Sequence, residues 1–401
     1  MKTSLNTLIA NFLEMAGYLF SLDSNESLIS SIQKGVYSTR IKDPSNGIWR
    51  INVEGTFADY CSMREGDNVY FFIKRKIYGI GILTNVGLDC KYLNYPLSNN
   101  PIVQTYENVE GNILATFEGI NSLHYRFICT FKPSPFFFNN GIDMDELLSS
   151  SPSQFKILRA FHKLSFIKFS DDENQAFKNI ILRRNLSNLE NTNNPNFLTS
   201  NFVEFHQEIA SKINNNSSYS LSIEPFLSTI QERNGQIRHE MAVEAALIYQ
   251  LSIQDNQTLT IFGNWDYLSH QVIASPFKPI DYMDKMDVFG YRYIINQKPT
   301  ISHYLVIEIK KGQVTSDDLI QLMKYVDWVK NEYAFSDYSM IEAFMIGYSF
   351  THEALASFSN IIERKYIQGA RPSIPSEWNN VKLVTYAFNE GNNLLEFHLV
   401  S

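Results

Sequence analysis

The sequence predicts a mixed α+β protein, in which a β-rich barrel with helices precedes an α/β domain. Its length of 401 residues favours more than one domain, because a single hydrophobic core rarely exceeds about 250 to 300 residues. Residues 1–185 are rich in short aromatic and β-branched runs, whereas residues 225–401 alternate helical and strand patterns. Residues 186–224 are Asn- and Ser-rich around one amphipathic segment, which predicts a linker with a helical piece.

The first domain is expected to open with an amphipathic helix over residues 5–16. Aromatic and β-branched residues flank the basic turn Lys74–Lys76, and this pattern predicts a hairpin over residues 66–83. Further strands are predicted at residues 48–53, 113–117 and 125–131, with helices inside 144–184 and at 202–213. Many short strands between turn residues are typical of a barrel.

The second domain is expected to alternate helices and strands. A helix is predicted first, at residues 237–251, and Ser316 is a candidate cap for a later helix at 317–332. Strands are predicted at 259–262, 272–274, 287–295, 304–310 and 343–349, followed by a helix at 352–365 and late strands at 381–388 and 394–400. This order predicts a mixed α/β sheet.

Composition excludes several classes of protein. No segment approaches the roughly 18 consecutive apolar residues of a membrane span, and no G-x-x-x-x-G-K-[ST] loop for a nucleoside triphosphate occurs. The three scattered cysteines support neither a disulfide framework nor a Cys-based zinc site, so we expect a reducing cytoplasm. The net charge of −8 argues against coating nucleic acid by bulk attraction. Nucleic acid would need a local groove or a cation.

Charged residues gather at the end of one predicted strand. Glu308 and Lys310 are two residues apart and share a face, while the apolar residues between and before them face the core. Asp287 begins the preceding strand, and a hairpin-like return would bring it beside Glu308. Two close carboxylates repel each other unless a cation or a proton lies between them.

Magnesium suits such a pair, because it takes oxygen ligands and keeps water and phosphate oxygens in its shell. Mn²⁺ is expected to substitute for it. With Lys310 beside the ion to orient or deprotonate a water molecule, the implied reaction is phosphodiester hydrolysis. The alternative is that Glu308 and Lys310 form an ordinary exposed pair at a strand end, since short motifs occur by chance.

Two helices add residues to this array. Gln321 and Tyr325 are four apart on one helical face, as are Glu240 and Glu244 on the first helix of the domain. Either glutamate could serve the site, and the choice stays open. Asp281 and Asp284 are rival candidates for the first acid in place of Asp287.

The array of Asp287, Glu308-Ile309-Lys310 and Gln321-x-x-x-Tyr325 resembles the PD-(D/E)xK nucleases, and its last element is similar to the RecB-type and NucS-type branch. The resemblance covers about residues 225–370 and implies a restriction-endonuclease-like αβββαβ domain. It implies that Asp287, Glu308 and Glu240 ligate the metal, that Lys310 positions the attacking water, and that Gln321 and Tyr325 support the site. Met286 stands where the motif has proline, a departure compatible with the chemistry.

The first domain resembles the PUA-like and EVE group of barrels, through its Gly-Asp turn at residues 66–67 and the I-x-G-I-G strand that follows. This resemblance implies recognition of nucleic acid, including modified bases. A flipped base needs aromatic rings on which to stack. The candidates are Trp49, Phe57, Tyr60 and Tyr78, for each of which a place in the barrel core is the alternative.

These observations together predict a magnesium-dependent DNA endonuclease of a restriction or defence system, with target selection by the first domain. Cutting two strands with one site per chain predicts a homodimer. One alternative is a nucleic-acid-binding or sensing protein with a catalytically silent nuclease fold. Another is a nuclease that cleaves RNA.

Overall fold

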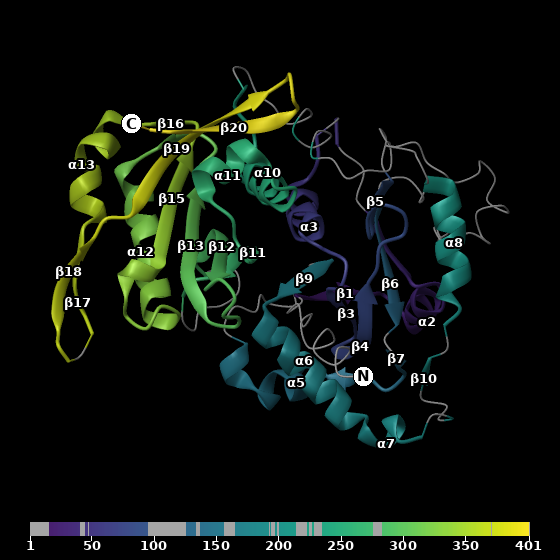
Figure 1. The fold of residues 1–401 in the computed structure, drawn as a ribbon. Coiled ribbons are helices and arrows are strands. Elements are labelled where there is room, and N and C mark those ends of the chain that lie inside the picture. Colours follow the sequence, from purple (N-terminus) through teal and green to yellow (C-terminus); the bar gives the residue numbers. More distant parts are fainter. Residues whose placement is uncertain are drawn as a thin grey trace, which may run out of the picture.

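The structure is a computed structural model of a mixed α+β protein. It describes residues 16–40, 45–46, 48–94, 126–133, 137–155, 165–191, 193, 197–198, 200–213, 223, 227, 235–275, 283–369 and 371–400. The helix expected before residue 16, the strand expected at 113–117 and the rival acid Asp281 lie outside these residues. Figure 1 shows two large sheets, one formed by the first part of the chain and one by the last.

The first sheet is curled into a half-barrel, in the order β2-β6-β4-β3-β1-β9, with β5 added to β6 and β8 to β4. Its strands are β1 (Gly17–Ser21), β2 (Val36–Arg40), β3 (Asn68–Ile73), β4 (Lys76–Leu83), β5 (Lys91–Asn94), β6 (Arg126–Pro133), β8 (Ile142–Asp143) and β9 (Phe166–Phe169). A separate short pair joins β7 (Phe137–Phe138) to β10 (Phe197–Leu198). A curled sheet of this kind agrees with the predicted barrel only in part, since no pairing between described residues joins its end strands β2 and β9.

The predicted hairpin is present as β3 and β4. These strands are antiparallel, and the turn between them places Lys74 and Arg75 at φ of 46° and 70°. Two successive left-handed residues give the tight turn whose twist matches that of the paired strands. The Gly66-Asp67 turn precedes β3, and the Asp67 carboxylate accepts a hydrogen bond from the Arg64 backbone N–H at 2.9 Å.

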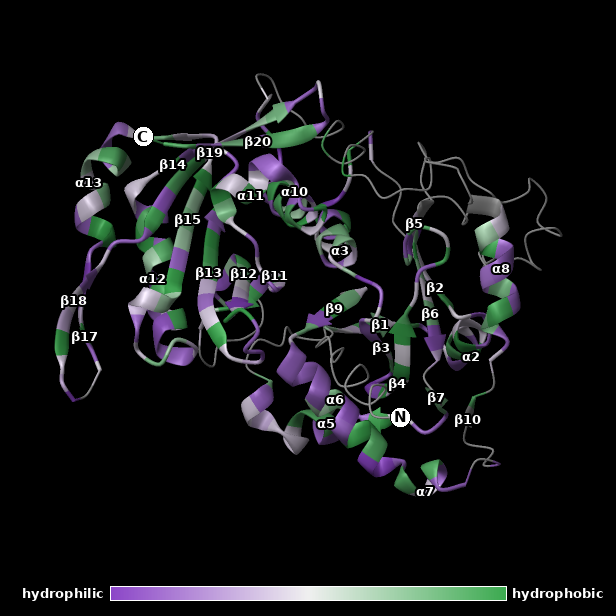
Figure 2. Ribbon diagram, in the orientation of Figure 1, coloured by the Kyte–Doolittle hydropathy of each residue, from purple (hydrophilic) through white to green (hydrophobic). Residues whose placement is uncertain are grey.

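Helices pack around the first sheet. Helix α6 (Asp171–Arg184) is capped by Ser170 and Glu173 and shows hydrophilic and hydrophobic segments in Figure 2, as expected for a helix that covers a sheet on one side. The other helices among the described residues of this part are α2 (Asn25–Lys34), α3 (Ile51–Cys61), α5 (Met144–Ser150), η2 (Pro152–Gln154), α7 (Leu186–Leu189) and α8 (Phe202–Ile213). The prediction of a strand at 48–53 was wrong, because Val53 and Phe57 instead form the buried side of α3.

The second sheet has the order β11-β12-β13-β15-β19-β20. Its strands are β11 (Tyr267–Ile273), β12 (Lys285–Tyr293), β13 (Ile301–Ile309), β15 (Ile341–Gly347), β19 (Val381–Asn389) and β20 (Leu394–Leu399). The first three are antiparallel, β13, β15 and β19 are parallel, and β20 returns antiparallel. Two small pairs stand apart, β14 (Gln313–Val314) with β16 (Ser349–Phe350) and β17 (Arg364–Gln368) with β18 (Ile374–Trp378).

Helices cover both faces of this sheet. Residues of α10 (Glu240–Ser252) and α11 (Asn256–Phe262) share one hydrophobic cluster with Leu305 and Ile307, whereas α12 (Ser316–Glu332), the short helix η6 (Tyr338–Met340) and α13 (His352–Ile362) share the other with Val306. The prediction of a strand at 259–262 was wrong, because Asp255 caps a helix there. The capping residue of α12 is Thr315 rather than Ser316.

The two parts of the molecule meet where α3 packs along α10 (Figure 1). One continuous hydrophobic cluster includes Phe57 of α3, Leu247 of α10 and Ile307 of β13. In the described part of the chain, no helix has the length and apolar character needed to cross a membrane.

Candidate active site

The register of β12 and β13 brings two acids together. Val288 pairs with Ile307 in this antiparallel ladder, so Asp287 and Glu308 follow on neighbouring strands. The backbone N–H of Ile309 donates a hydrogen bond of 2.7 Å to Oδ2 of Asp287. Glu308 is 1% exposed, so this strand end holds a carboxylate that is almost removed from water.

Lys310 completes the strand end. Its Nζ donates a hydrogen bond of 2.7 Å to Oε1 of Glu308 and lies 4.0 Å from Oδ1 of Asp318 on α12. Burial opposes the charge of this amine, yet the carboxylates of Glu308 and Asp287 raise the pKa of Lys310 above its usual value. Lys310 is therefore an ammonium group that donates hydrogen bonds, which favours orienting a water molecule over deprotonating it.

The two acids are held in an environment that favours protons or a cation. Burial raises the pKa of Asp287 well above its usual value, and the nearby Glu244 and Glu308 carboxylates add to this effect. Burial likewise raises the pKa of Glu308 to about 7, against the lowering effect of Lys310. This combination of desolvation with like charges is characteristic of functional sites.

A third acid comes from helix α10, and it is Glu244. Its side chain is 2% exposed, and the Gln271 amide donates to both of its carboxylate oxygens at 3.0 and 3.1 Å. The same amide donates to Oδ1 of Asp287 at 3.2 Å. Glu240 lies one turn away, where its Oε1 accepts from the Lys311 backbone N–H at 3.3 Å. Of the two glutamates, Glu244 is the one joined to Asp287 through a shared partner.

Gln271 occupies an unusual backbone conformation. It is a strand residue with a φ of 53°, in the left-handed region that non-glycine residues seldom adopt. Such backbone strain costs about 1 to 3 kcal/mol and gathers at functional sites. Sequence reasoning missed this residue, because nothing in its neighbourhood signals a left-handed position.

Helix α12 supplies the remaining predicted residues. The Nε2 of Gln321 donates a hydrogen bond of 2.9 Å to the Tyr325 hydroxyl, as their spacing on one helical face predicts. Burial raises the pKa of Tyr325 to about 12, and the Glu308 and Asp287 carboxylates contribute to this rise. The Tyr325 hydroxyl is therefore close enough to Glu308 and Asp287 to be affected by their charges.

The rival acid Asp284 precedes β12, where its carbonyl accepts a hydrogen bond of 2.8 Å from the Ala274 N–H. Asp287, by contrast, is the acid that Ile309 and Gln271 contact. Met286 is fully buried and pairs with Val272 across β11 and β12. It fills the position before the acid with a packed apolar side chain.

The donor set suits a hard divalent cation. Carboxylate oxygens of Glu244 and Asp287 converge on a single donor, the Gln271 amide nitrogen, and Oε2 of Glu308 is buried with no hydrogen-bond partner among the residues that the structure describes. Within the described ranges, no three or more His, Cys, Asp or Glu side chains form a group that could hold a metal by themselves. A Mg²⁺ ion at these acids would therefore depend on water and substrate oxygens for much of its shell, as is usual for this ion.

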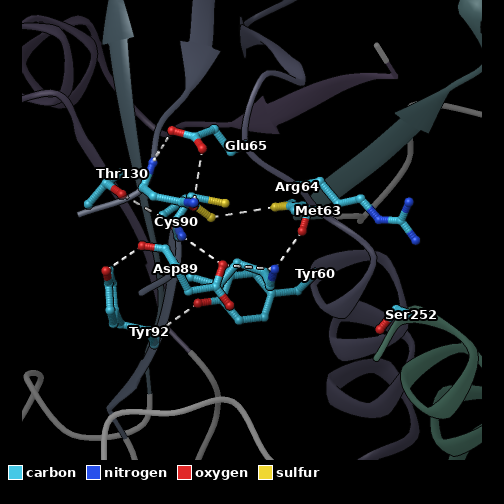
Figure 3. Close-up of polar contacts among 12 residues, drawn as sticks. Tyr60, Met63, Arg64, Glu65, Asp89, Cys90, Tyr92, Thr130 and Ser252 are labelled. Carbon is cyan, nitrogen blue, oxygen red and sulfur yellow. Dashed lines mark hydrogen bonds and ion pairs between the residues drawn. The ribbon is translucent and has the colours of Figure 1, made fainter. Parts of the chain in front are cut away.

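The four aromatic candidates for base binding lie in the hydrophobic core. Trp49 is 3% exposed, Phe57 and Tyr60 are 0% exposed and Tyr78 is 9% exposed. Tyr60 lies within a network of polar contacts (Figure 3), and its hydroxyl donates to the Tyr92 carbonyl at 2.7 Å. Its ring also stacks on Phe127 at a centroid distance of 4.7 Å. This burial argues against stacking of a base on these rings and favours the alternative of core packing.

No protein-family model matches this chain, and comparison with curated proteins finds no match. The chemistry of the strand-end site is therefore the basis on which a function can be argued.

Proposed function

We propose that this protein is a Mg²⁺-dependent endonuclease that hydrolyses phosphodiester bonds of DNA. The observation that carries the proposal is the buried pair of Asp287 and Glu308 on adjacent strands, with the ammonium group of Lys310 bonded to Glu308 at 2.7 Å. Buried acids without a cation or proton are costly to retain. A site that binds a divalent ion accounts for that cost.

Each residue has a distinct role in this proposal. Asp287 and Glu308 would hold the ion, which Mn²⁺ can replace, and Glu244 would lend a third carboxylate through water or directly. When bound, Mg²⁺ polarises the phosphoryl oxygen and lowers the pKa of a coordinated water. Lys310 would donate a hydrogen bond to the oxygen of the attacking water. This water would lose its proton to solvent as it forms the new P–O bond, and the departing ester oxygen would take up a proton from solvent.

The surrounding residues would keep this arrangement fixed. The Ile309 N–H holds one oxygen of Asp287, and the Gln271 amide holds the other. Gln321 and Tyr325 would support the position of α12 against the strand end, where Asp318 also lies near Lys310. Preorganised dipoles of this kind need no reorganisation during the reaction.

The first part of the chain would select the target, as the PUA-like resemblance implies, with modified bases as one class of target. The enzyme would then act in restriction or defence and would form a homodimer to cut both strands. RNA cleavage and binding without hydrolysis are the competing functions, and both are outcomes of the experiment below.

The test is a cleavage assay on supercoiled plasmid, modified and unmodified, and on matched RNA, with Mg²⁺, Mn²⁺ or EDTA. We expect divalent-dependent nicking or linearisation of DNA that is lost in Asp287→Asn, Glu308→Gln and Lys310→Ala. Asp145→Asn, Glu377→Gln and Lys365→Ala make the same chemical changes at exposed positions and should retain activity. Unchanged cleavage in the first three variants would remove the site, and binding without cleavage by the wild type would favour the silent nuclease fold.

A further inference from the structure

Helix α3, in the first part of the chain, places two buried acids beside α10 and β11 of the second part. Glu54 is 0% exposed and Asp59 is 2% exposed, although both lie on a helix that packs into an apolar interface with α10. Buried carboxylates require partners of opposite charge or hydrogen-bond donors. A histidine of the second part of the chain lies beside each of these two acids.

The first bridge joins Glu54 to His239, with 2.8 Å between Oε1 and Nδ1. Burial raises the pKa of Glu54, while the hydrogen bond from His239 lowers it and the Glu244 carboxylate raises it further. His239 directly precedes Glu240 at the start of α10. Glu54 therefore contacts the N-terminus of the helix that carries both candidate first-helix acids.

The second contact runs through His270, whose two ring nitrogens lie at ion-pair distances from carboxylates without hydrogen-bond geometry. Its Nε2 lies 3.3 Å from Oδ1 of Asp59, and its Nδ1 lies 3.5 Å from Oε2 of Glu244. The imidazole, which is 3% exposed at its side chain, thus lies between an acid of α3 and an acid of the proposed active site. The next residue is Gln271, whose amide joins Glu244 to Asp287.

A glycine allows this close approach. A Cβ atom at Gly55 would lie 3.3 Å from Sδ of Met241 and 3.6 Å from Cε1 of His270. These contacts place the backbone of α3 directly against α10 and the His270 ring. A side chain longer than a methyl group at position 55 would meet the flexible end of Met241 and the His270 ring.

Stabilisation of the interface between α3 and α10 does not by itself account for these two contacts. Replacing buried ion pairs by apolar residues of similar volume is often neutral or stabilising, so such pairs are weak contributors to adhesion. Polar groups held against metal-binding side chains, in contrast, fix the orientation of those side chains, and the His270 ring is held at 3.5 Å from the Glu244 carboxylate. Both bridges end at α10 or at Glu244 itself.

We infer that α3 completes the active site from outside the nuclease domain, with Asp59 acting through His270 to position Glu244 and Glu54 acting through His239 to fix the start of α10. This inference rests on the proposed function. Asp59, His270, Glu54 and His239 are positioning residues, since none of them contacts Asp287, Glu308 or Lys310 in the contacts described above. Target binding to the first part of the chain would then have a direct physical route to the metal site.

The experiment measures Mg²⁺ binding to the full chain by calorimetry and the kcat and KM for DNA at several Mg²⁺ concentrations. We expect Asp59→Asn to weaken Mg²⁺ binding about 10- to 100-fold, the usual range for partners of metal ligands. Its cleavage defect should shrink as Mg²⁺ is raised, with KM for DNA unchanged. Asp145→Asn, an equal substitution at an exposed ion pair with Arg75, should bind Mg²⁺ as the wild type does.

The second variant is His270→Gln, which keeps a polar group beside Glu244 and loses the contact to Asp59. It should weaken Mg²⁺ binding, and adding Asp59→Asn to it should change the affinity no further, because Asp59 acts through position 270. If Asp59→Asn does not fold, as judged by circular dichroism, His270→Gln decides the question. If Asp59→Asn or His270→Gln folds and binds Mg²⁺ with the affinity of the wild type, the inference is overturned.

The proposed function and this inference fail in different ways. Should Asp287→Asn and Glu308→Gln also bind Mg²⁺ like the wild type, the proposed metal site itself is refuted. Should those two variants lose Mg²⁺ while Asp59→Asn and His270→Gln bind it normally, only the role of α3 is refuted.

Discussion

Oδ2 of Asp287 accepts a 2.7 Å hydrogen bond from the backbone N–H of Ile309, just beyond the last pair of the ladder between β12 and β13. A side chain here takes the place of a strand carbonyl as acceptor. The acid is consequently fixed by the end of the sheet itself, where β13 ends at Ile309 and Lys310 follows.

This bond makes Asp287→Asn a sharp test of charge. An amide oxygen can still accept from Ile309, but the new NH2 group would face the Gln271 amide that donates to Oδ1 of Asp287, so we expect a modest fall in melting temperature. The negative charge is lost, and we expect Mg²⁺ binding and cleavage to fall by about 100-fold or more. Calorimetry and plasmid cleavage measure the two effects. A large loss of stability with normal Mg²⁺ affinity would contradict this expectation.

The two glutamates of α10 should differ. Glu244 is buried and shares the Gln271 amide with Asp287, whereas Glu240 accepts a bond from Lys311 at the end of the strand. We expect Glu244→Gln to reduce Mg²⁺ affinity at least tenfold more than Glu240→Gln, because it removes charge from the buried cluster. Parallel Mg²⁺ titrations check this, and the reverse order would assign the role to Glu240.

Stability without metal should fall as the pH rises. Burial raises the pKa of Glu308 from its usual value to about 7, so the folded state binds a proton that the unfolded chain releases at lower pH. The stabilisation from this group is complete in acid and is lost as the pH rises through about 7. Mg²⁺ binds the deprotonated acids and should therefore raise the melting temperature more at about pH 8 than at about pH 6.

Thermal unfolding in EDTA and in Mg²⁺ across this range measures both effects. Glu308→Gln is the control, because it removes the titrating carboxylate. In this variant the melting temperature should differ less between the two pH values than it does in the wild type. An identical pH dependence in wild type and Glu308→Gln would show that other groups govern it.

Tyr60→Phe separates core packing from base recognition. The Tyr92 and Ile128 carbonyls share the single proton of this fully buried hydroxyl, at 2.7 and 2.5 Å, and the hydroxyl accepts from the Ile128 N–H at 3.2 Å. Its removal leaves buried acceptors unpaired and should reduce the free energy of unfolding by about 1 to 3 kcal/mol. DNA affinity should stay unchanged at temperatures where the variant is folded. Denaturant unfolding and binding assays check the two statements, and a selective loss of DNA binding would restore Tyr60 as a base-binding residue.

Local patterns were sufficient for much of the fold. The β3–β4 hairpin and helix α12 follow from signals within a few residues, namely a turn between aromatic strands and a capped amphipathic stretch. The convergence of Asp287 and Glu308 also follows, because the two acids lie at the ends of successive antiparallel strands in which Val288 pairs with Ile307. The proposed barrel is seen only as a curled sheet, since closure depends on pairings that local sequence does not encode.

The failures have physical reasons as well. Residues 51–61 contain β-branched and aromatic residues, yet packing of this segment against α10 favours a helix over the intrinsic preference for a strand. Glu240 and Glu244 lie on one helical face, so spacing could not decide which of them meets Asp287. The left-handed Gln271 and the bridge from Asp59 to His270 depend on tertiary contacts between distant segments.

The hydrophobic cluster that runs from Phe57 through Leu247 to Ile307 ties the unfolding of both parts of the molecule together. Separating them would expose apolar surface on each, at a cost of about 25 cal/mol for every Å² uncovered. Heating should then melt the chain in one cooperative transition. A fragment that contains only one of the two sheets would expose the apolar side chains that the other part covers, and it would tend to aggregate.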